Sequence, residues 1–108
     1  MSHVLRAAYT RGKVDPKLIQ DIAVGNVLPL GGGATAARMA ALSADIPVST
    51  AVNTVNRQCS SGLTAINQIA NEIRAGQIDI GIGKSPNLSP VTPTALTPHS
   101  VQVLVSNP

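Results

Sequence analysis

The clearest hydrophobic pattern in the chain lies between residues 63 and 73. Its apolar positions keep the three- and four-residue spacing of one helix face, Arg74 follows where a helix favours positive charge, and Gly76 supplies a stop. These apolar positions are Leu63, Ile66, Ile69, Ala70 and Ile73. The pattern therefore predicts a helix that packs one face against a core.

Two more helices are predicted upstream. Residues 3–11 place Val4, Leu5 and Ala8 on one helix face and end beside Gly12, while residues 35–43 are rich in Ala, Arg and Met and suit a closely packed helix. Asp is a residue type preferred at the N-cap of a helix, and Pro is preferred at the first helical position. Asp15 and Pro16 therefore predict one helical turn.

Apolar, β-branched segments separate these helices. Residues 22–27, 52–55 and 78–83 are predicted strands, each between two helical segments or after one. Alternation of helix and strand is typical of a mainly parallel α/β sheet with helices on both faces. The fold class predicted for residues 3–83 is therefore α/β.

The composition changes at Lys84. Prolines at 86, 90, 93 and 98 alternate with Ser, Thr and Asn, and proline at that density prevents regular pairing. We predict a Pro/Ser/Thr-rich disordered tail over residues 84–108. Within it, Val101–Val105 has the composition of a short strand whose partner the sequence does not name.

Composition and charge exclude several classes of protein. The chain has 108 residues, 44% of them hydrophobic, which suits one small domain, but one Tyr and no Phe or Trp make the core light. The net charge of +3 comes from scattered basic residues, without the basic face of a nucleic-acid binder. No apolar run approaches the roughly 20 residues of a membrane helix, and the N-terminus lacks a secretory layout.

Cys59 is the only cysteine and lies where a predicted strand gives way to the strongest predicted helix. A lone cysteine forms no internal disulfide and no cysteine metal cluster, which favours a reducing compartment. Helix N-termini favour the thiolate, so one interpretation is a reactive nucleophile. The other is a small buried hydrophobic residue. Local chemistry leaves both interpretations open.

Residues 56–65, Asn-Arg-Gln-Cys-Ser-Ser-Gly-Leu-Thr-Ala, resemble the nucleophile signature of peroxisomal-type 3-ketoacyl-CoA thiolases. Asp15-Pro16 with 24–28 resembles the second strand of that family, 36–41 the following helix, and 73–77 the end of the helix behind the cysteine. The similarity runs from about Val4 to Gly83. It implies a thiolase-like N-terminal half-domain.

The resemblance also implies an activity: thiolytic cleavage of 3-ketoacyl-CoA to acyl-CoA and acetyl-CoA in fatty acid β-oxidation. Cys59 would be the nucleophile that carries the acyl group as a thioester, and its backbone amide would donate to the oxyanion. Coenzyme A would be a substrate, with no permanently bound cofactor. A peroxisomal location, and a homodimer or a full-length thiolase subunit as partner, are implied in the same way.

This sequence departs from the family in several places. The Asn-Glu-Ala-Phe motif, the Gly-His-Pro histidine and the second cysteine do not occur, and His3 and His99 match no family motif and are expected to be exposed. The family sheet order 3-2-1-4-5 implies that the central first strand is missing. After Gly83 the family's Glu-Ser-Met stretch is replaced by unrelated sequence. The chain alone is therefore expected to be inactive.

Three other functions fit parts of the sequence. Gly31–Ala36 matches the loose dinucleotide pattern G-x-G-x-x-A, without an acidic residue about 20 positions further on. A catalytically dead thiolase relic, or a mis-spliced product, could bind full-length subunits through exposed strands. A cysteine hydrolase is the third, although no histidine lies in a recognisable supporting motif.

Overall fold

One four-stranded sheet forms the centre of the molecule. The computed structural model describes residues 1–85 and 101–105. The strand order is β2-β1-β3-β4, where β1 is Asp21–Gly25, β2 is Ala51–Val55, β3 is Ile80–Lys84 and β4 is Val101–Val105. β1 pairs in parallel with both β2 and β3, whereas β4 pairs antiparallel with β3. The predicted α/β class is confirmed.

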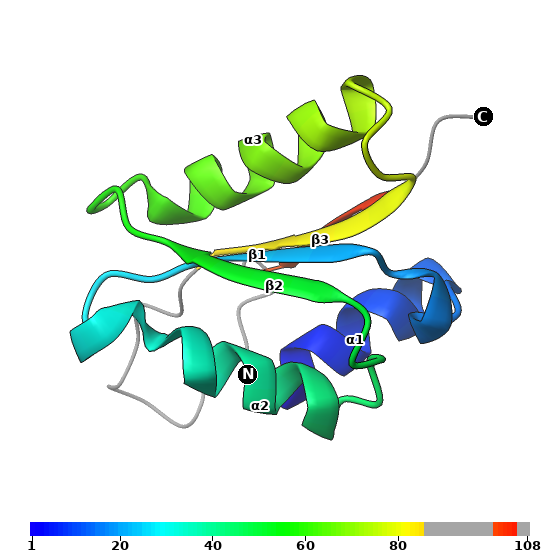
Figure 1. Cartoon of the computed structure of the whole chain (residues 1–108), viewed down its shortest axis with the longest axis horizontal. Helices are drawn as coiled ribbons and strands as arrows, with labels where there is room; N and C mark the ends of the chain where they lie inside the picture. The colour runs from blue at the N-terminus through cyan, green and yellow to red at the C-terminus, as the bar shows by residue number, and fades with distance from the viewer. Residues whose placement is uncertain (86–100, 106–108) are drawn as a thin grey trace.

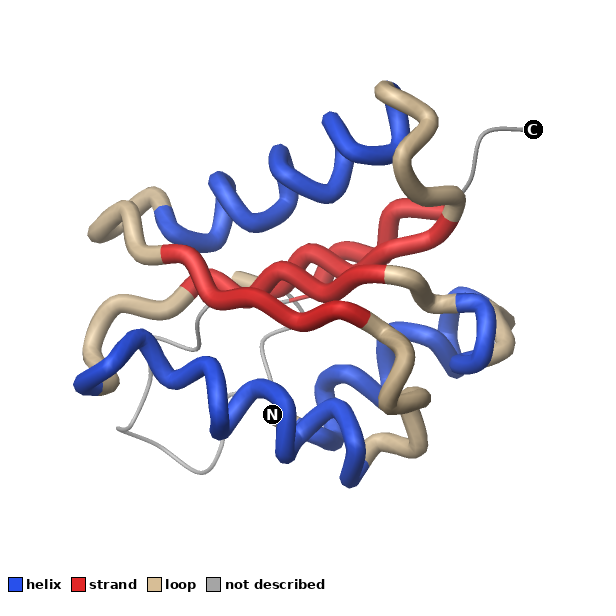
Figure 2. The backbone as a smooth tube through the Cα atoms, viewed as in Figure 1, coloured by secondary structure: helices blue, strands red, loops and turns tan. Residues whose placement is uncertain are grey.

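Helices cover both faces of this sheet, as predicted (Figure 1). α1 (Ser2–Gly12) and α2 (Ala34–Ser43) lie on one face, and α3 (Ser61–Arg74) lies on the other. Figure 2 shows the strands as the middle of three layers. The loops that follow β1 and β2 therefore reach the same edge of the sheet, where parallel strands present their carboxyl ends.

The helix boundaries follow local chemistry. The Asp15 carboxylate accepts a hydrogen bond of 2.9 Å from the Lys17 amide and caps the short 3₁₀ turn Pro16–Leu18, as predicted. The stop of α1 differs from the prediction by one residue. Lys13, with φ of 53°, takes the left-handed conformation expected of Gly12, and its amide donates to Thr10 O at 3.2 Å.

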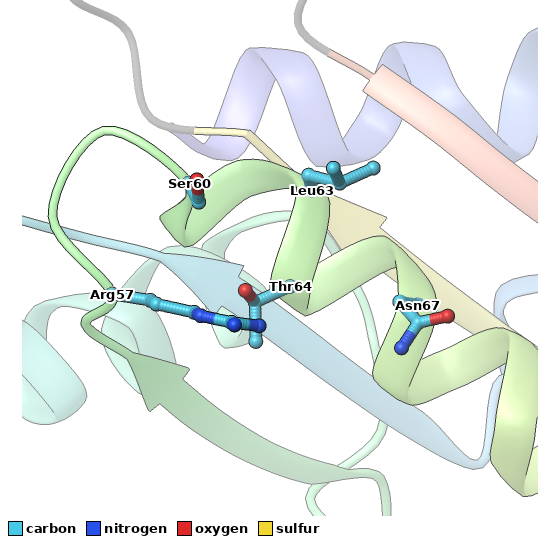
Figure 3. Close-up of a pocket in the computed structure, with 5 residues that line it drawn as sticks. All are labelled: Arg57, Ser60, Leu63, Thr64 and Asn67. Atoms are coloured by element: carbon cyan, nitrogen blue, oxygen red, sulfur yellow. The ribbon is translucent and has the colours of Figure 1, made fainter.

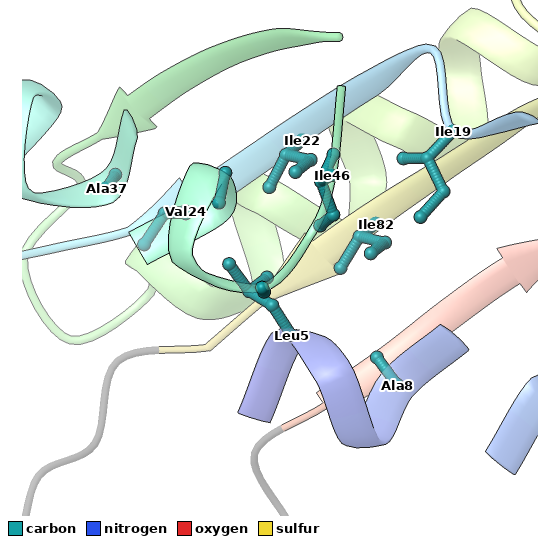
Figure 4. Close-up of a cluster of buried hydrophobic side chains, with 10 residues drawn as sticks. Leu5, Ala8, Ile19, Ile22, Val24, Ala37, Ile46 and Ile82 are labelled. Atoms are coloured by element: carbon teal, nitrogen blue, oxygen red, sulfur yellow. The ribbon is translucent and has the colours of Figure 1, made fainter. Parts of the chain in front are cut away.

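The main core lies between the sheet and the helices α1 and α2 (Figure 4). Ile22 of β1 and Ile82 of β3 meet Leu5 of α1 and the two buried alanines of α2, Ala37 and Ala41. The buried set is Leu5, Ala8, Ile19, Ile22, Val24, Ala37, Ala41, Ala44, Ile46 and Ile82. Because most of these side chains are aliphatic and small, the predicted light core is confirmed.

A second, smaller core lies between the sheet and α3, where Ala23, Ala65 and Ile69 are buried. The predicted hydrophobic face of this helix is correct at Ile69, but Leu63 is 71% exposed. The buried N-terminal positions are instead Ser61 and Gly62. Small side chains there let the helix approach the sheet closely, which a hydrophobic pattern does not register.

The sheet has no gap at its centre. The family order placed a missing strand between the strands that correspond to β1 and β3, yet these two are hydrogen-bonded to each other, with Ile22 opposite Ile82. β1 therefore takes a place between two neighbours. Because β1 and β3 pair directly, neither strand is left with an unpaired edge at the centre of the sheet.

Most of the predicted tail lies outside the described residues. Two parts of it are described: Lys84 is the last residue of β3 and is 2% exposed, and Val101–Val105 is a strand whose partner is β3. β3 therefore extends one residue past the predicted boundary at Gly83, and the partner that the sequence did not name for Val101–Val105 is a neighbour in the same sheet.

Candidate active site

Cys59 lies in the loop between β2 and α3, at the edge where the parallel strands end. Its side chain is exposed, so the interpretation as a small buried hydrophobic residue is wrong. α3 begins at Ser61 with Ser60 as its N-cap, and Cys59 therefore comes directly before the cap. The predicted position at a strand–helix junction is confirmed.

The turn before Cys59 is sharp and is held by an asparagine. Gln58 has φ of 50°, a left-handed conformation that costs a non-glycine residue about 1 kcal/mol or more. Asn56 accepts a hydrogen bond of 3.0 Å from the Gln58 amide through Oδ1, and its Nδ2 donates to Val27 O at 3.4 Å. Asn56 thus ties the cysteine loop to the loop that follows β1.

A buried serine braces the other side of this loop. The Ser61 hydroxyl is fully buried, accepts from the Arg57 amide at 2.8 Å and donates to Gln58 O at 2.7 Å. The Ser61 amide also donates to Gln58 O, at 3.1 Å. Sequence reasoning did not single out Ser61, although serine side chains commonly bond nearby backbone groups in the first turn of a helix.

Glycines allow the start of α3 to touch the sheet. A Cβ on Gly25, the last residue of β1, would lie 2.6 Å from Gly62 N. A Cβ on Gly62 would lie 2.7 Å from the Cβ of Ser85. Two neighbouring segments therefore crowd around Gly62, which leaves no room for a side chain at this position. The N-terminus of α3 is fixed against the ends of β1 and β3.

An open hollow of about 310 Å³ lies beside the cysteine loop, on the outer side of α3 (Figure 3). Its lining supplies a guanidinium, two hydroxyls, an amide and one apolar side chain. The residues are Arg57, Ser60, Leu63, Thr64 and Asn67. Figure 3 shows the Arg57 side chain extended along the helix, with its guanidinium next to Thr64. Within residues 1–85 and 101–105, the only salt bridge joins Arg6 and Asp45, at 2.7 Å, so Arg57 has no carboxylate partner there.

The remaining candidates of the sequence lie apart from this loop. His3 is exposed on α1, as expected, and His99 is outside the described residues. Gly31, Gly32 and Gly33 all have φ near 70°, and Asn26 Nδ2 donates to Gly32 O at 3.1 Å. The positive φ angles therefore explain why glycine occupies these positions in the turn that leads into α2, and a bound nucleotide is not needed to explain them.

Two titratable groups outside the cysteine loop are shielded from solvent, Asp21 in part and Lys84 almost fully. Burial raises the pKa of Asp21, at the opposite end of β1, and repulsion from Glu72 adds to this effect. Among the described residues, Asp21 Oδ1, Glu72 Oε2 and Asn53 Oδ1 are buried without a hydrogen-bond partner. Burial lowers the pKa of Lys84, whose Nζ donates to Ser85 O at 3.0 Å.

A search of the described residues finds no group of three or more His, Cys, Asp or Glu side chains placed to hold a metal ion. In the same part of the chain, no helix has the length and apolarity needed to cross a membrane.

Fold and loop together define an α/β domain that presents a cysteine at a tight turn before a helix. The family model described as thiolase, N-terminal domain, matches residues 1–84. The chain belongs to the thiolase family.

Its relatives include peroxisomal enzymes from yeasts. It is 54% identical over 83 residues to the peroxisomal 3-ketoacyl-CoA thiolase of Yarrowia lipolytica, covering 77% of this chain and 20% of that protein. For the Saccharomyces cerevisiae protein of the same name the identity is 57% over 70 residues, covering 65% and 17%. The chain thus spans about a fifth of the length of the curated relatives it matches.

Solved structures give the same result. The peroxisomal 3-ketoacyl-CoA thiolase of Saccharomyces cerevisiae superposes with a TM-score of 0.68 at 46% identity, covering 76% of this chain and 25% of that one. The Acat5 thiolase from Ascaris suum, solved in complex with coenzyme A, gives a TM-score of 0.72 at 28% identity, covering 96% and 28%. The resemblance of the sequence to this family is confirmed.

Proposed function

We propose that this chain carries the acyl-accepting part of a thiolase site, with Cys59 as the nucleophile. One observation carries the proposal: the cysteine of the thiolase-like signature is exposed on a braced turn directly before the N-cap of α3. A thiol in that position is accessible to a thioester and lies directly before the positive end of a helix dipole.

The reaction follows from the chemistry of a thiolate. The Cys59 sulfur attacks the 3-keto carbon of a 3-ketoacyl-CoA, and the bond between carbons 2 and 3 breaks. Carbon 2 keeps the electron pair and takes a proton, which gives acetyl-CoA and an acyl-cysteine. The sulfur of a second coenzyme A then attacks the acyl carbon, the bond to Cys59 breaks, and acyl-CoA leaves. Covalent catalysis thus replaces one difficult cleavage with two easier steps.

Each attack creates a negative oxygen on the carbonyl carbon. We infer that the backbone amide of Cys59 donates to this oxygen, together with the field of the α3 N-terminus. The proton for carbon 2 needs a general acid, and His3 lies on α1, outside the cysteine loop. The complete cleavage is therefore assigned to an assembly that supplies that acid, and acyl transfer to Cys59 to this chain.

The partners and the location that we propose for this chain are based on its relatives. Several relatives are peroxisomal 3-ketoacyl-CoA thiolases, and one solved relative is the dimeric peroxisomal thiolase of Saccharomyces cerevisiae. We propose coenzyme A thioesters as substrates, the peroxisome as location and a thiolase subunit as partner. The second candidate function, a non-catalytic chain that binds full-length subunits, is favoured by the open outer edge of β2, whose only paired neighbour in the described sheet is β1.

Mass spectrometry of the purified chain after incubation with acetyl-CoA tests the catalytic proposal. The expected result is one added acetyl group that maps to Cys59 and is removed by free coenzyme A. Cys59→Ala is the control and should gain none. A wild-type chain that stays unlabelled would overturn the proposal for the isolated chain, and co-purification with a full-length thiolase would then support the binding function.

A further inference from the structure

The loop around Cys59 is closed by one side chain that the proposed chemistry does not use. The Ser61 hydroxyl bonds Arg57 N at 2.8 Å and Gln58 O at 2.7 Å. These two backbone groups precede Cys59, whereas Ser61 is the first residue of α3. One oxygen therefore connects both sides of the cysteine.

The oxygen does two things that no apolar side chain can do. It accepts from an N–H and donates to a C=O, so it satisfies one donor and one acceptor in a fully buried position. The neighbouring serine offers a contrast, because Ser60 is exposed and lines the hollow. Removal of the Ser61 hydroxyl would take this partner from the Arg57 amide and from the Gln58 carbonyl, so the loop would lose two part-buried hydrogen bonds.

The brace acts on the residue whose backbone is strained. Gln58 has φ of 50°, and its carbonyl oxygen accepts hydrogen bonds from both the hydroxyl and the amide of Ser61. The peptide that follows this carbonyl carries the amide of Cys59. A carbonyl held in one orientation therefore holds the attached N–H in the opposite one, because the peptide unit is planar.

We propose that Ser61 is a positioning residue for acyl transfer at Cys59, which it serves by fixing the orientation of the Gln58–Cys59 peptide. The inference rests on the proposed function of Cys59. Oxyanion donors work only within a few tenths of an ångström and about 10–20° of the productive geometry. Without the Ser61 hydroxyl the Gln58–Cys59 peptide can rotate. The stabilisation of the tetrahedral intermediate then weakens, although the thiol stays exposed.

The test compares two reactions of the same sulfur. Acetylation by acetyl-CoA needs an oxyanion donor, whereas alkylation by iodoacetamide needs only an accessible thiolate. For Ser61→Ala, we expect the acetylation rate at Cys59 to fall at least tenfold and the alkylation rate to stay within twofold of wild type. Ser49→Ala changes an exposed serine just before β2, at the end of that strand away from Cys59; it is the control and should change neither rate. An unchanged acetylation rate, or an equal loss of both reactions, overturns the proposal.

A second pair of variants separates the hydroxyl from the shape of the side chain. Ser61→Thr and Ser61→Val differ only by a hydroxyl and a methyl group, so any damage from added bulk is common to both. We expect the Thr variant to acetylate at least tenfold faster than the Val variant. Equal rates in the two variants overturn the proposal even if Ser61→Ala does not fold.

Hydrogen exchange keeps the two proposals distinguishable. If wild type is not acetylated, the proposed function of the isolated chain fails, and the exchange rate of the Arg57 amide still reports on the brace. Faster exchange at this amide in Ser61→Ala than in Ser49→Ala supports the role of the hydroxyl in holding the loop. Equal exchange overturns it.

Discussion

Gly25 and Gly62 lie in direct backbone contact: a Cβ placed on Gly25 would be 2.6 Å from the nitrogen of Gly62. The first glycine ends the central strand β1, and the second is in the first turn of α3. This contact sets the height of the helix start above the sheet. It therefore sets the position of the cysteine loop that leads into the helix.

Gly25→Ala should accordingly destabilise the domain. A Cβ at this position meets backbone atoms that cannot rotate away, so α3 must shift, at a cost of about 1–3 kcal/mol. Gly31→Ala is the control, because its Cβ meets nothing within 4 Å and only the left-handed backbone, at about 1 kcal/mol, opposes it. Urea unfolding measures both, and a smaller loss for Gly25→Ala than for Gly31→Ala would contradict the contact.

The two apolar residues Ile69 and Leu63 of α3 should respond differently to truncation. Ile69 is fully buried and Leu63 is 71% exposed. We expect Ile69→Ala to lower the free energy of unfolding by about 2–5 kcal/mol and Leu63→Ala to change it by no more than about 0.5 kcal/mol. Chemical denaturation of both variants checks this difference, and similar losses would show that the described burial is wrong.

Asp21→Asn should stabilise the domain near neutral pH. The folded-state pKa of Asp21 is raised above its ordinary value of 3.8, so the folded chain binds this proton more tightly than the unfolded chain does. The ionised carboxylate therefore costs stability above the folded pKa, and this cost disappears as the pH falls below 3.8. The stability gained by Asp21→Asn at pH 7 should vanish in acid.

Thermal unfolding between pH 3 and pH 7 measures this dependence. Asp79→Asn changes an exposed acid at the same end of the sheet and should alter stability by no more than about 0.5 kcal/mol. A wild-type protein more stable than Asp21→Asn at pH 7 would contradict the raised pKa of Asp21 that burial, together with Glu72, produces.

Lys84→Met should also raise stability at neutral pH. Burial lowers the pKa of Lys84 below 10.5, so the charged amine costs free energy at pH 7, and that cost fades as the pH rises toward 10.5. Methionine keeps a similar length without the charge, and the expected gain is on the order of 1 kcal/mol. Urea unfolding at pH 7 and at pH 10.5 should show the larger gain at pH 7. Lys17→Met, at an exposed lysine, is the control and should have little effect.

Local sequence chemistry predicted much of the fold and part of the site. Asp15 and Pro16 predicted a capped turn because capping depends on neighbours in the chain, and Cys59 was placed correctly because a strand and a helix meet there. Leu63 was placed wrongly in the core. Its spacing fits a helix face, but the face that reaches the sheet is chosen by the small residues Gly62 and Ala65.

The sequence by itself determined the order of elements, the thiolase resemblance and the presence of one thiol at the start of a helix, because these depend on short-range pattern and composition. Only the tertiary structure decided that β1 pairs with β3, that Lys84 is buried, and that the Ser61 hydroxyl holds the backbone before Cys59. Pairing, burial and hydroxyl orientation depend on atoms brought together by folding. The spacing of residues along the chain therefore does not specify strand pairing, burial or hydroxyl orientation.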